Sequence, residues 1–253
     1  MLEEHRKIWQ SKQSLRLVYA DLYKRMNEAA NEGLSLEVGS GIGAFDFDKG
    51  PLVRSDIQPS CGNNIVCDAH VMPFPGGCFS NIFLVDVLHH LESPVAFLEE
   101  ALRVLGPDGK IIMIEPGMSL LSYWFYKFFH HEPVDMSWEP TRGYSRSNRR
   151  DPYEGNQAIP TILFKGKHSC SSILLSLNLR RVKSQWLSLL AYPLTGGFSQ
   201  WCLLPKKMAV PILNFEKIFE RSLGWLLGFR LMVVIQKKST FDIDSPEKGV
   251  GRF

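Results

Sequence analysis

The residues best suited to chemistry follow short apolar runs in the first half of the chain. Glu37 lies at the end of one run, and the turn Gly39-Ser40-Gly41-Ile42-Gly43 comes directly after it. Glycine lets the backbone turn sharply and approach a ligand with no Cβ in the way, as in nucleotide-binding loops. By itself such a turn is a weak signal, and its GxGxG spacing differs from the GxGxxG of dinucleotide-binding loops.

Acidic residues follow the next apolar runs, at points where strands are expected to end. Asp56 follows the second run, where a carboxylate can accept hydrogen bonds from both hydroxyls of a ribose. Asp68 follows the third run and can accept from an adenine amino group, while the small Ala69 leaves room for stacking. One such acid is more often a helix cap or a turn residue. Several acids at expected strand ends, together with the glycine turn, instead indicate that this edge of the sheet binds a ligand.

Alternating strand and helix patterns supply the elements that position these residues. A helix is expected from Ser93, its N-cap, to Leu105, and Gly106-Pro107 lies beyond its end. Short turns between the patterns predict an α/β fold: a doubly wound, Rossmann-like, seven-stranded, mostly parallel sheet with helices on both faces. The expected strands cover 34–38, 52–55, 64–67, 82–85, 109–114, 181–189 and 229–236, and the later helices cover 168–177 and 209–223.

Four segments are expected in this organisation. Residues 1–31 have the periodicity of one amphipathic helix, 32–237 form the main domain, and 238–253 form a flexible tail. Within the main domain, 117–160 interrupt the pattern after the fifth strand and predict an inserted lid. Its aromatic run SYWFYKFFHH suits the lid's own core, an apolar acceptor pocket or a surface that touches a lipid.

Composition excludes several classes of protein. The 253 residues carry a net charge of +3 with 45% hydrophobic residues, which excludes a disordered chain and a dedicated nucleic-acid binder. The five cysteines form no CxxC motif, so neither a zinc ribbon nor a thioredoxin motif is present. No apolar run is long enough for a transmembrane helix, and the first residues do not form a secretory signal. We expect a cytoplasmic protein, with contact at a membrane surface left open.

The runs LEVGSGIG, SDI, CDAHVMPFP, FLVDVLHHLESP and EEALRVLGPDGKIIMIEP occur in this order within 34–116. Together they resemble the class I S-adenosylmethionine-dependent methyltransferases, in particular the small-molecule enzymes of the type 11 and ubiquinone/menaquinone-biosynthesis kind. The resemblance implies S-adenosylmethionine as cofactor and methyl transfer to a small-molecule or lipid-like acceptor. The segment between Gly43 and Leu52 is short, so the helix after the glycine turn should have only one or two turns.

The resemblance also implies roles for the residues at the strand ends. Glu37 and the glycine turn would hold the methionine end of the cofactor, Asp56 and Ile57 the ribose, and Asp68 and Ala69 the adenine. Asp86 and Val87 would lie beside the transferred methyl group. The cofactor set is therefore Glu37, Gly39, Ser40, Gly41, Gly43, Asp56, Ile57, Asp68, Ala69, Asp86 and Val87.

Candidates on the acceptor side are less determined, because a general base is needed only if the acceptor must lose a proton. His89, His90 and His131 are candidates for that base or for acceptor positioning, although either of the first two could instead pack and cap a turn. The candidate substrate contacts are Glu115, Tyr123, His130, Arg149 and Arg150. The arginines could be a solvated loop or could grip a phosphate or carboxylate. We expect no metal, because adjacent ligands in His130-His131-Glu132 point apart.

Two other functions remain compatible with such a sequence. One is a catalytically silent cofactor-binding or scaffold protein of the same fold, and the other is a nicotinamide-dependent oxidoreductase. The glycine spacing disfavours the oxidoreductase, and the intact strand-end acids disfavour the scaffold. The acceptor, the atom methylated and the oligomeric state are not predicted.

Overall fold

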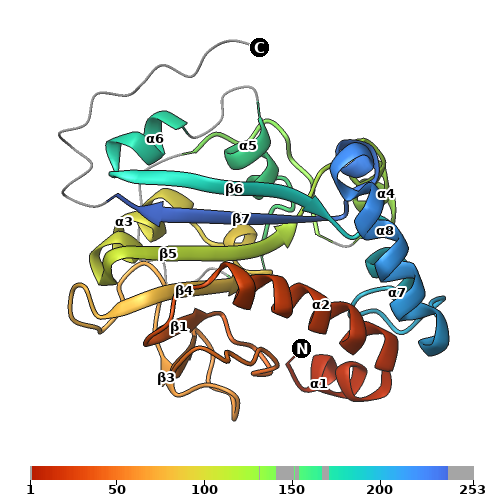
Figure 1. Ribbon diagram of the computed structural model, residues 1–253, viewed down its shortest axis with the longest axis horizontal. Helices are drawn as coiled ribbons and strands as arrows, with labels where there is room; N and C mark the ends of the chain where they lie inside the picture. The colour runs from red at the N-terminus through yellow and green to blue at the C-terminus, as the bar shows by residue number, and fades with distance from the viewer. Residues whose placement is uncertain (1, 131, 141–150, 152–153, 167–170, 239–253) are drawn as a thin grey trace.

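A seven-stranded sheet forms the centre of the protein (Figure 1), in the order β3-β2-β1-β4-β5-β7-β6. The computed structural model describes residues 2–130, 132–140, 151, 154–166 and 171–238. All neighbouring strands pair in parallel except β7, which is antiparallel to both β5 and β6. The predicted seven-stranded, mostly parallel Rossmann-like sheet is confirmed. Its strands are β1 Ser35–Val38, β2 Leu52–Asp56, β3 Ile65–Val66, β4 Phe79–Val85, β5 Leu105–Pro116, β6 Leu179–Leu187 and β7 Arg230–Lys237.

Helices cover both faces of this sheet (Figure 1). On one face, α2 (Gln13–Ala29) and α8 (Lys206–Leu227) pack against Ile112, and the short α7 (Ala191–Thr195) lies beside them. On the other face, α3 (Pro94–Val104), α5 (Ile159–Lys165) and α6 (Ser171–Ser176) pack against Ile111. Successive strand residues point to opposite faces, so adjacent isoleucines of β5 belong to two separate cores.

The N-terminal segment differs from the single helix predicted over 1–31. It forms two helices, α1 (Leu2–Ser11) and α2, which are separated at Lys12. The buried Lys12 Nζ donates hydrogen bonds to the carbonyl oxygens of Thr195, Gly197 and Trp201. These distant carbonyls satisfy the ammonium, and the backbone leaves helical geometry at this residue (φ −96°, ψ 89°). Helical periodicity could not reveal this tertiary contact.

The turn between β1 and β2 also differs from the sequence prediction. Residues 39–51, all of which the structure describes, contain a short turn and no helix, where one or two helical turns were expected. The chain instead crosses directly to β2, with Phe45 buried beside Phe83 of β4. In contrast, α3 begins as predicted, with Ser93 Oγ accepting from the Ala96 amide at 3.2 Å.

The region predicted as a lid begins with the aromatic helix α4 (Leu120–Phe129). Ser119 and Ser122 form a capping box at its start. Tyr126 is buried against Phe229, and Ser119 Oγ donates to the Leu226 carbonyl of α8, so α4 is fixed beside α8. A closing motion of this region stays a prediction. Within the described residues, no helix is long and apolar enough to cross a membrane.

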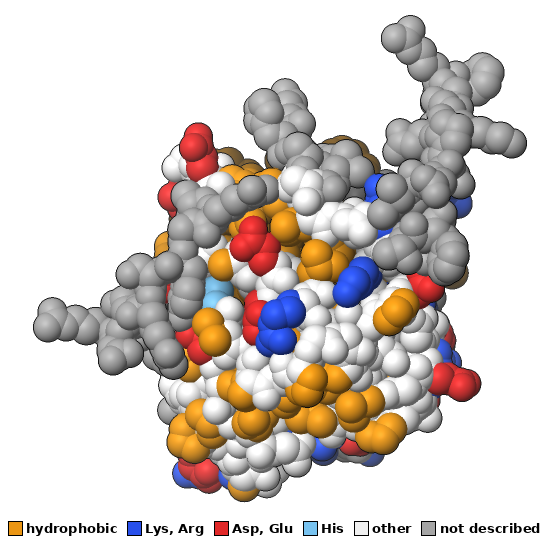
Figure 2. All heavy atoms as spheres, turned by 90° about the vertical axis from the view of Figure 1, so that its left-hand side faces the viewer, with side chains coloured by type: hydrophobic (Ala, Val, Ile, Leu, Met, Phe, Trp, Pro, Cys, Tyr) orange, Lys and Arg blue, Asp and Glu red, His pale blue; other side chains and the backbone are white. Residues whose placement is uncertain are grey.

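The strand order reverses between β1 and β4, because β2 lies on one side of β1 and β5 lies on the far side of β4. At such a switch point the crevice beyond the carboxyl ends of the strands is where ligands bind in α/β sheets. On another side of the molecule, shown in Figure 2, basic and acidic side chains are interspersed among apolar ones. No broad basic patch is visible among the described residues on that face.

Candidate functional site

A cavity of about 390 Å³ lies at this switch point. The carboxyl ends of β1, β2 and β4 form its floor, and residues of α2, η1 (Leu88–His90) and α4 contribute to its walls. The lining includes all but one of the predicted cofactor residues: Glu37, Gly39, Ser40, Gly41, Asp56, Ile57, Asp68, Ala69, Asp86 and Val87. Gly43 is outside the lining. A Cβ on Gly43 would lie 3.0 Å from the Gly62 Cα, so this glycine allows two loops to meet.

The glycine turn is held closed by a carboxylate from the neighbouring strand. Asp56 Oδ2 accepts from the Gly41 amide at 2.8 Å, and Asp56 Oδ1 accepts from the Gln58 amide at 2.9 Å. Gly39 has φ +68°, and a Cβ there would lie 2.4 Å from Val87 Cγ2. Glycine is therefore required at position 39 both by the backbone and by the packing of β1 against the loop after β4.

Glu37 is a buried carboxyl group at the end of β1. Burial raises its pKa to about 8, even though the Arg54 guanidinium 3.3 Å away favours the charged form. Glu37 Oε2 has no hydrogen-bond partner in good geometry, and neither has the buried Ser40 Oγ. Buried polar atoms that lack a hydrogen bond cost free energy, so two of them beside a cavity mark a place where a ligand donor fits.

Asp68 is positioned by a short chain of hydrogen bonds. Its Oδ1 accepts from the His70 amide at 2.9 Å and lies 2.7 Å from His70 Nδ1. His70 Nε2 in turn accepts from the Ser93 amide at 3.3 Å, at the start of α3. The carboxylate and the buried Ala69 thus have fixed positions at one end of the cavity.

The half-buried Asp86, which follows β4, forms a charge pair with the buried Arg230 at the start of β7. Its Oδ2 accepts from Tyr19 Oη at 2.9 Å and from Arg230 Nη2 at 2.5 Å. Burial opposes ionisation of Asp86, but the Arg230 charge outweighs it, so the pKa of Asp86 is below its usual value. The Arg230 guanidinium also lies 4.4 Å from the Tyr192 ring centre. Asp86 has φ +58°, a conformation that non-glycine residues rarely adopt and that such contacts can maintain.

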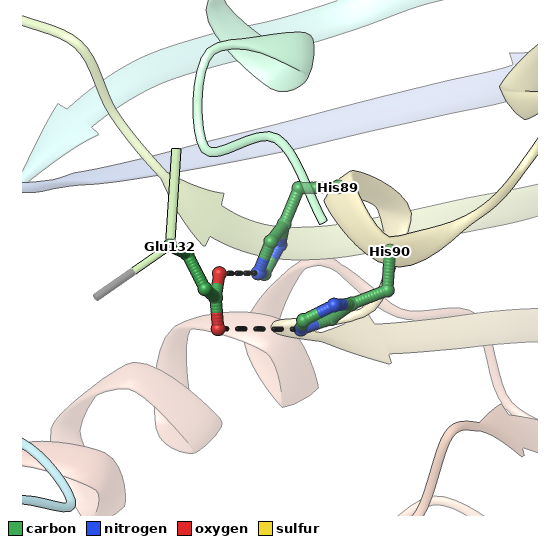
Figure 3. A group of neighbouring side chains, drawn as sticks. All are labelled: His89, His90 and Glu132. Atoms are coloured by element: carbon green, nitrogen blue, oxygen red, sulfur yellow. Dashed lines mark ion pairs between the residues drawn. The ribbon is translucent and has the colours of Figure 1, made fainter. Parts of the chain in front are cut away.

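Beside this pair, His89, His90 and Glu132 come together (Figure 3). His89 Nε2 lies 3.5 Å from Glu132 Oε2, and His90 Nε2 lies 4.0 Å from Glu132 Oε1. His89 Nδ1 contacts Glu115 Oε2 at 2.7 Å. Burial lowers the pKa of His89, but the two carboxylates outweigh it and raise the pKa to about 9. His89 is therefore an imidazolium at neutral pH, and it occupies the position between carboxylates that a cation would take.

His90 has the opposite protonation state. Burial and the adjacent His89 charge lower the pKa of His90 to about 4, so its ring is neutral at pH 7. Burial opposes ionisation of Glu132, but His89 lowers the Glu132 pKa to about 2. Gln157 Nε2 also donates to Glu132 Oε2. His89, His90 and Glu132 thus lie close enough together to hold a metal ion. The protonated His89 already supplies a positive charge within this group.

Two of the predicted acceptor-side residues lie outside the cavity lining, and three others lie outside the described residues. Glu115 is fully buried and outside the cavity lining, because it accepts from the Val87 and Leu88 amides and holds His89. Tyr123 lies on α4 outside the lining, with its hydroxyl accepting from Lys127 Nζ at 3.4 Å. His130 does line the cavity. His131, Arg149 and Arg150 lie outside the described residues.

Sequence reasoning missed the residues that reach the cavity from the two ends of the chain. They are mainly aromatic, and they include Tyr19, Tyr192, Phe198 and Arg230. The aromatic residues look like ordinary core positions in a sequence. Arg230, a single charge at the start of an apolar strand, was the one available signal, because a buried arginine needs a partner.

The chain is similar to known methyltransferases in sequence and in fold. A methyltransferase domain family matches residues 7–113. A SAM-dependent methyltransferase from Archaeoglobus fulgidus is 17% identical, with a TM-score of 0.50, over 88% of this chain and 94% of that one. Another from Thermotoga maritima is 15% identical, with a TM-score of 0.51, over 89% and 91%. No curated protein matches the sequence.

The domain match begins within α1 and ends within β5, so it includes the glycine turn and the acids at the ends of β1, β2 and β4. The similar structures share the fold over most of both chains. S-adenosylmethionine is the cofactor of this class of enzymes. Residues 7–113 of this chain therefore match a methyltransferase domain, and the chain has the fold of the S-adenosylmethionine-dependent methyltransferases to which it is similar.

Proposed function

We propose that this protein transfers the methyl group of S-adenosylmethionine to a small-molecule or lipid-like acceptor in the cavity at the β1–β4 switch point. The observation that carries the proposal is the pair of unsatisfied buried atoms, Glu37 Oε2 and Ser40 Oγ, next to the glycine turn. The ammonium group of the methionine moiety is a donor that both oxygens would accept. A bound ammonium would also stabilise the ionised form of Glu37.

The remaining strand-end acids fit the other parts of the cofactor. Each Asp56 oxygen already accepts one amide hydrogen, and each has a further lone pair for a ribose hydroxyl. Asp68 is fixed by His70 and can accept from the adenine amino group, while Ala69 permits close approach of the ring. Ile57, about half exposed and in the cavity lining, provides an apolar contact.

On the acceptor side, the walls combine aromatic rings with a few fixed polar groups. Tyr19, Tyr126 and Tyr192 are buried or half-buried around Arg230 and Asp86. This lining suits an acceptor with an apolar body, because aromatic rings supply large contact areas with defined geometry. His90, neutral at pH 7, can accept a hydrogen bond from a hydroxyl or amine of the acceptor. His89 cannot serve as a base at that pH, because it is already protonated.

Catalysis then depends chiefly on placement. When bound, S-adenosylmethionine supplies an electrophilic sulfonium methyl group. The protein orients the acceptor against the rigid Asp86–Arg230 pair and the His89–Glu132 pair, and it limits access of water with the tyrosines. Proximity and orientation of this kind lower barriers by up to roughly 7–11 kcal/mol.

The test is formation of S-adenosylhomocysteine with a panel of acceptors that includes hydroxyl and amine compounds with and without acyl or prenyl chains. We expect turnover with at least one acceptor, and a lower kcat for His90→Ala than for the control Asp48→Ala, which replaces an exposed acid outside the cavity. Cofactor binding without turnover on the whole panel would instead favour the scaffold function. Equal kcat for the two variants would contradict the role of His90.

A further inference from the structure

The surface formed by α4 and α8 is unusually apolar for a solvent-facing surface. On α4, the exposed side carries Trp124, Phe128 and Phe129. On α8, it carries Phe215, Ile218 and Trp225, which follow one side of the helix. Phe129 and Ile218 are 79% and 73% exposed, and we call these six residues the α4/α8 surface. Exposed apolar side chains gathered on two adjacent helices indicate an interaction site.

Charges on the two helices are separated by sign. The exposed charged residues of α4 and α8, both fully described, are all basic: Lys127, Lys206, Lys207, Arg221 and Lys217, the last of which pairs with Asp21 of α2. The two acidic residues of α8 are buried on its inner side, where Glu220 pairs with Arg25 and Glu216 accepts from the Leu190 and Ala191 amides. The outward side therefore presents aromatic and basic residues together with no exposed acid.

From this combination we infer that the α4/α8 surface docks the protein on an anionic lipid membrane. Aromatic and aliphatic side chains enter the boundary between headgroups and acyl chains, tryptophan prefers that boundary, and lysines contact anionic headgroups. Self-association through the same surface would bring basic residues of two copies together without compensating acids from these helices. The inference goes beyond the proposed function and does not depend on methyl transfer.

Docking in this way would place the membrane next to the cavity. The inner side of α4 contributes Tyr126 to the cavity wall, and His130 follows at its end. The outer side of the same helix bears Trp124 and Phe128. One short helix thus separates the proposed membrane contact from the acceptor side of the cavity. Its arrangement beside α8 is visible in Figure 1.

The test is co-sedimentation of the full chain with vesicles of phosphatidylcholine alone and of phosphatidylcholine with phosphatidylglycerol. We expect binding to the anionic vesicles, weak binding to the neutral ones, and a loss of binding as salt is raised. The double variant Lys206→Gln/Lys207→Gln should bind the anionic vesicles about tenfold more weakly or worse. Failure of the unmodified protein to bind anionic vesicles would overturn the inference.

Matched variants locate the contact. Phe128→Asp and Ile218→Asp should each weaken vesicle binding severalfold, whereas Val66→Asp, an equally charged change at an exposed residue of β3, should not. None of the three residues lines the cavity, so binding of S-adenosylmethionine reports that each variant is folded. Equal vesicle binding by all three variants would overturn the inference. A concentration-dependent dimer that Phe128→Asp dissociates, without vesicle binding, would assign the surface to self-association instead.

Discussion

The protonation state of Glu37 leads to a prediction about the cofactor. In the free protein, burial raises the Glu37 pKa to about 8, so the carboxyl group is close to fully protonated at pH 6.5. An ordinary α-amino group has a pKa of about 7.7–8.0 and is charged at that pH. If the ammonium binds beside Glu37, the carboxyl group must ionise, and its proton is released to the solvent.

The magnitude follows from the same pKa. At pH 6.5, binding should release about one proton. Because ionising Glu37 becomes easier as pH approaches its pKa, affinity should increase roughly fivefold from about pH 6.5 to about pH 7.5. The increase is less than tenfold because the ligand amine begins to lose its charge over that interval. Above the pKa of Glu37, loss of the ligand charge should lower the affinity again.

The assay is isothermal titration calorimetry with S-adenosylmethionine in buffers of different ionisation enthalpy, which gives the number of protons released. Glu37→Gln should bind more weakly and release almost none. Asp48→Asn, the same change at an exposed acid outside the cavity, should behave like the unmodified protein. Release of one proton by Glu37→Gln, or none by the unmodified protein at pH 6.5, would refute the reasoning.

Three further predictions concern the other fixed charges. Asp56→Ala should weaken S-adenosylmethionine binding roughly 10- to 100-fold, because it removes acceptors for the ribose and for the Gly41 amide; unchanged affinity would contradict the ribose assignment. The carboxylates around His89 raise its pKa to about 9 in the folded protein. Protonated His89 therefore contributes fully to the free energy of unfolding below about pH 6.5, and this contribution disappears as the pH rises through about 9. In urea unfolding, His89→Gln should therefore lower the free energy of unfolding more at about pH 6.5 than above about pH 9. An equal loss at the two pH values would contradict this prediction. Arg230→Met should cost about 3 kcal/mol because Asp86 keeps an unpaired, largely buried charge. The double variant Asp86→Asn/Arg230→Met should regain much of the lost free energy of unfolding, measured by chemical denaturation. A double variant as unstable as Arg230→Met alone would show that the two residues are not coupled.

Local sequence patterns were sufficient for the sheet and for most residues that line the cavity at its edge. Apolar runs that end in glycine or aspartate predicted β1, β2 and β4, and parallel strands necessarily bring their carboxyl ends to one edge. Asp56 and Asp86 thus appear at the cavity although 30 residues of chain separate them. The N-cap and proline of α3 gave its start, because capping depends on neighbouring residues alone.

Features that depend on distant parts of the chain were not predictable in this way. Lys12 interrupts the N-terminal helix because it reaches carbonyl oxygens near residue 195, and Glu115 is buried because it holds backbone amides after β4. The sequence did not show which aromatic residues of α4 are buried. In the structure, Tyr126 packs inward while Phe128 faces outward. Which side of α4 is buried depends on the position of α8, and local sequence patterns carry no information about that position.

Calorimetric titration of the unmodified protein shows whether the β1–β4 cavity binds S-adenosylmethionine. The titration uses S-adenosylmethionine, S-adenosylhomocysteine and NAD as separate ligands. We expect saturable binding of both sulfur nucleotides at one site per chain and no binding of NAD. Binding of neither sulfur nucleotide, or saturable binding of NAD in their place, would contradict it.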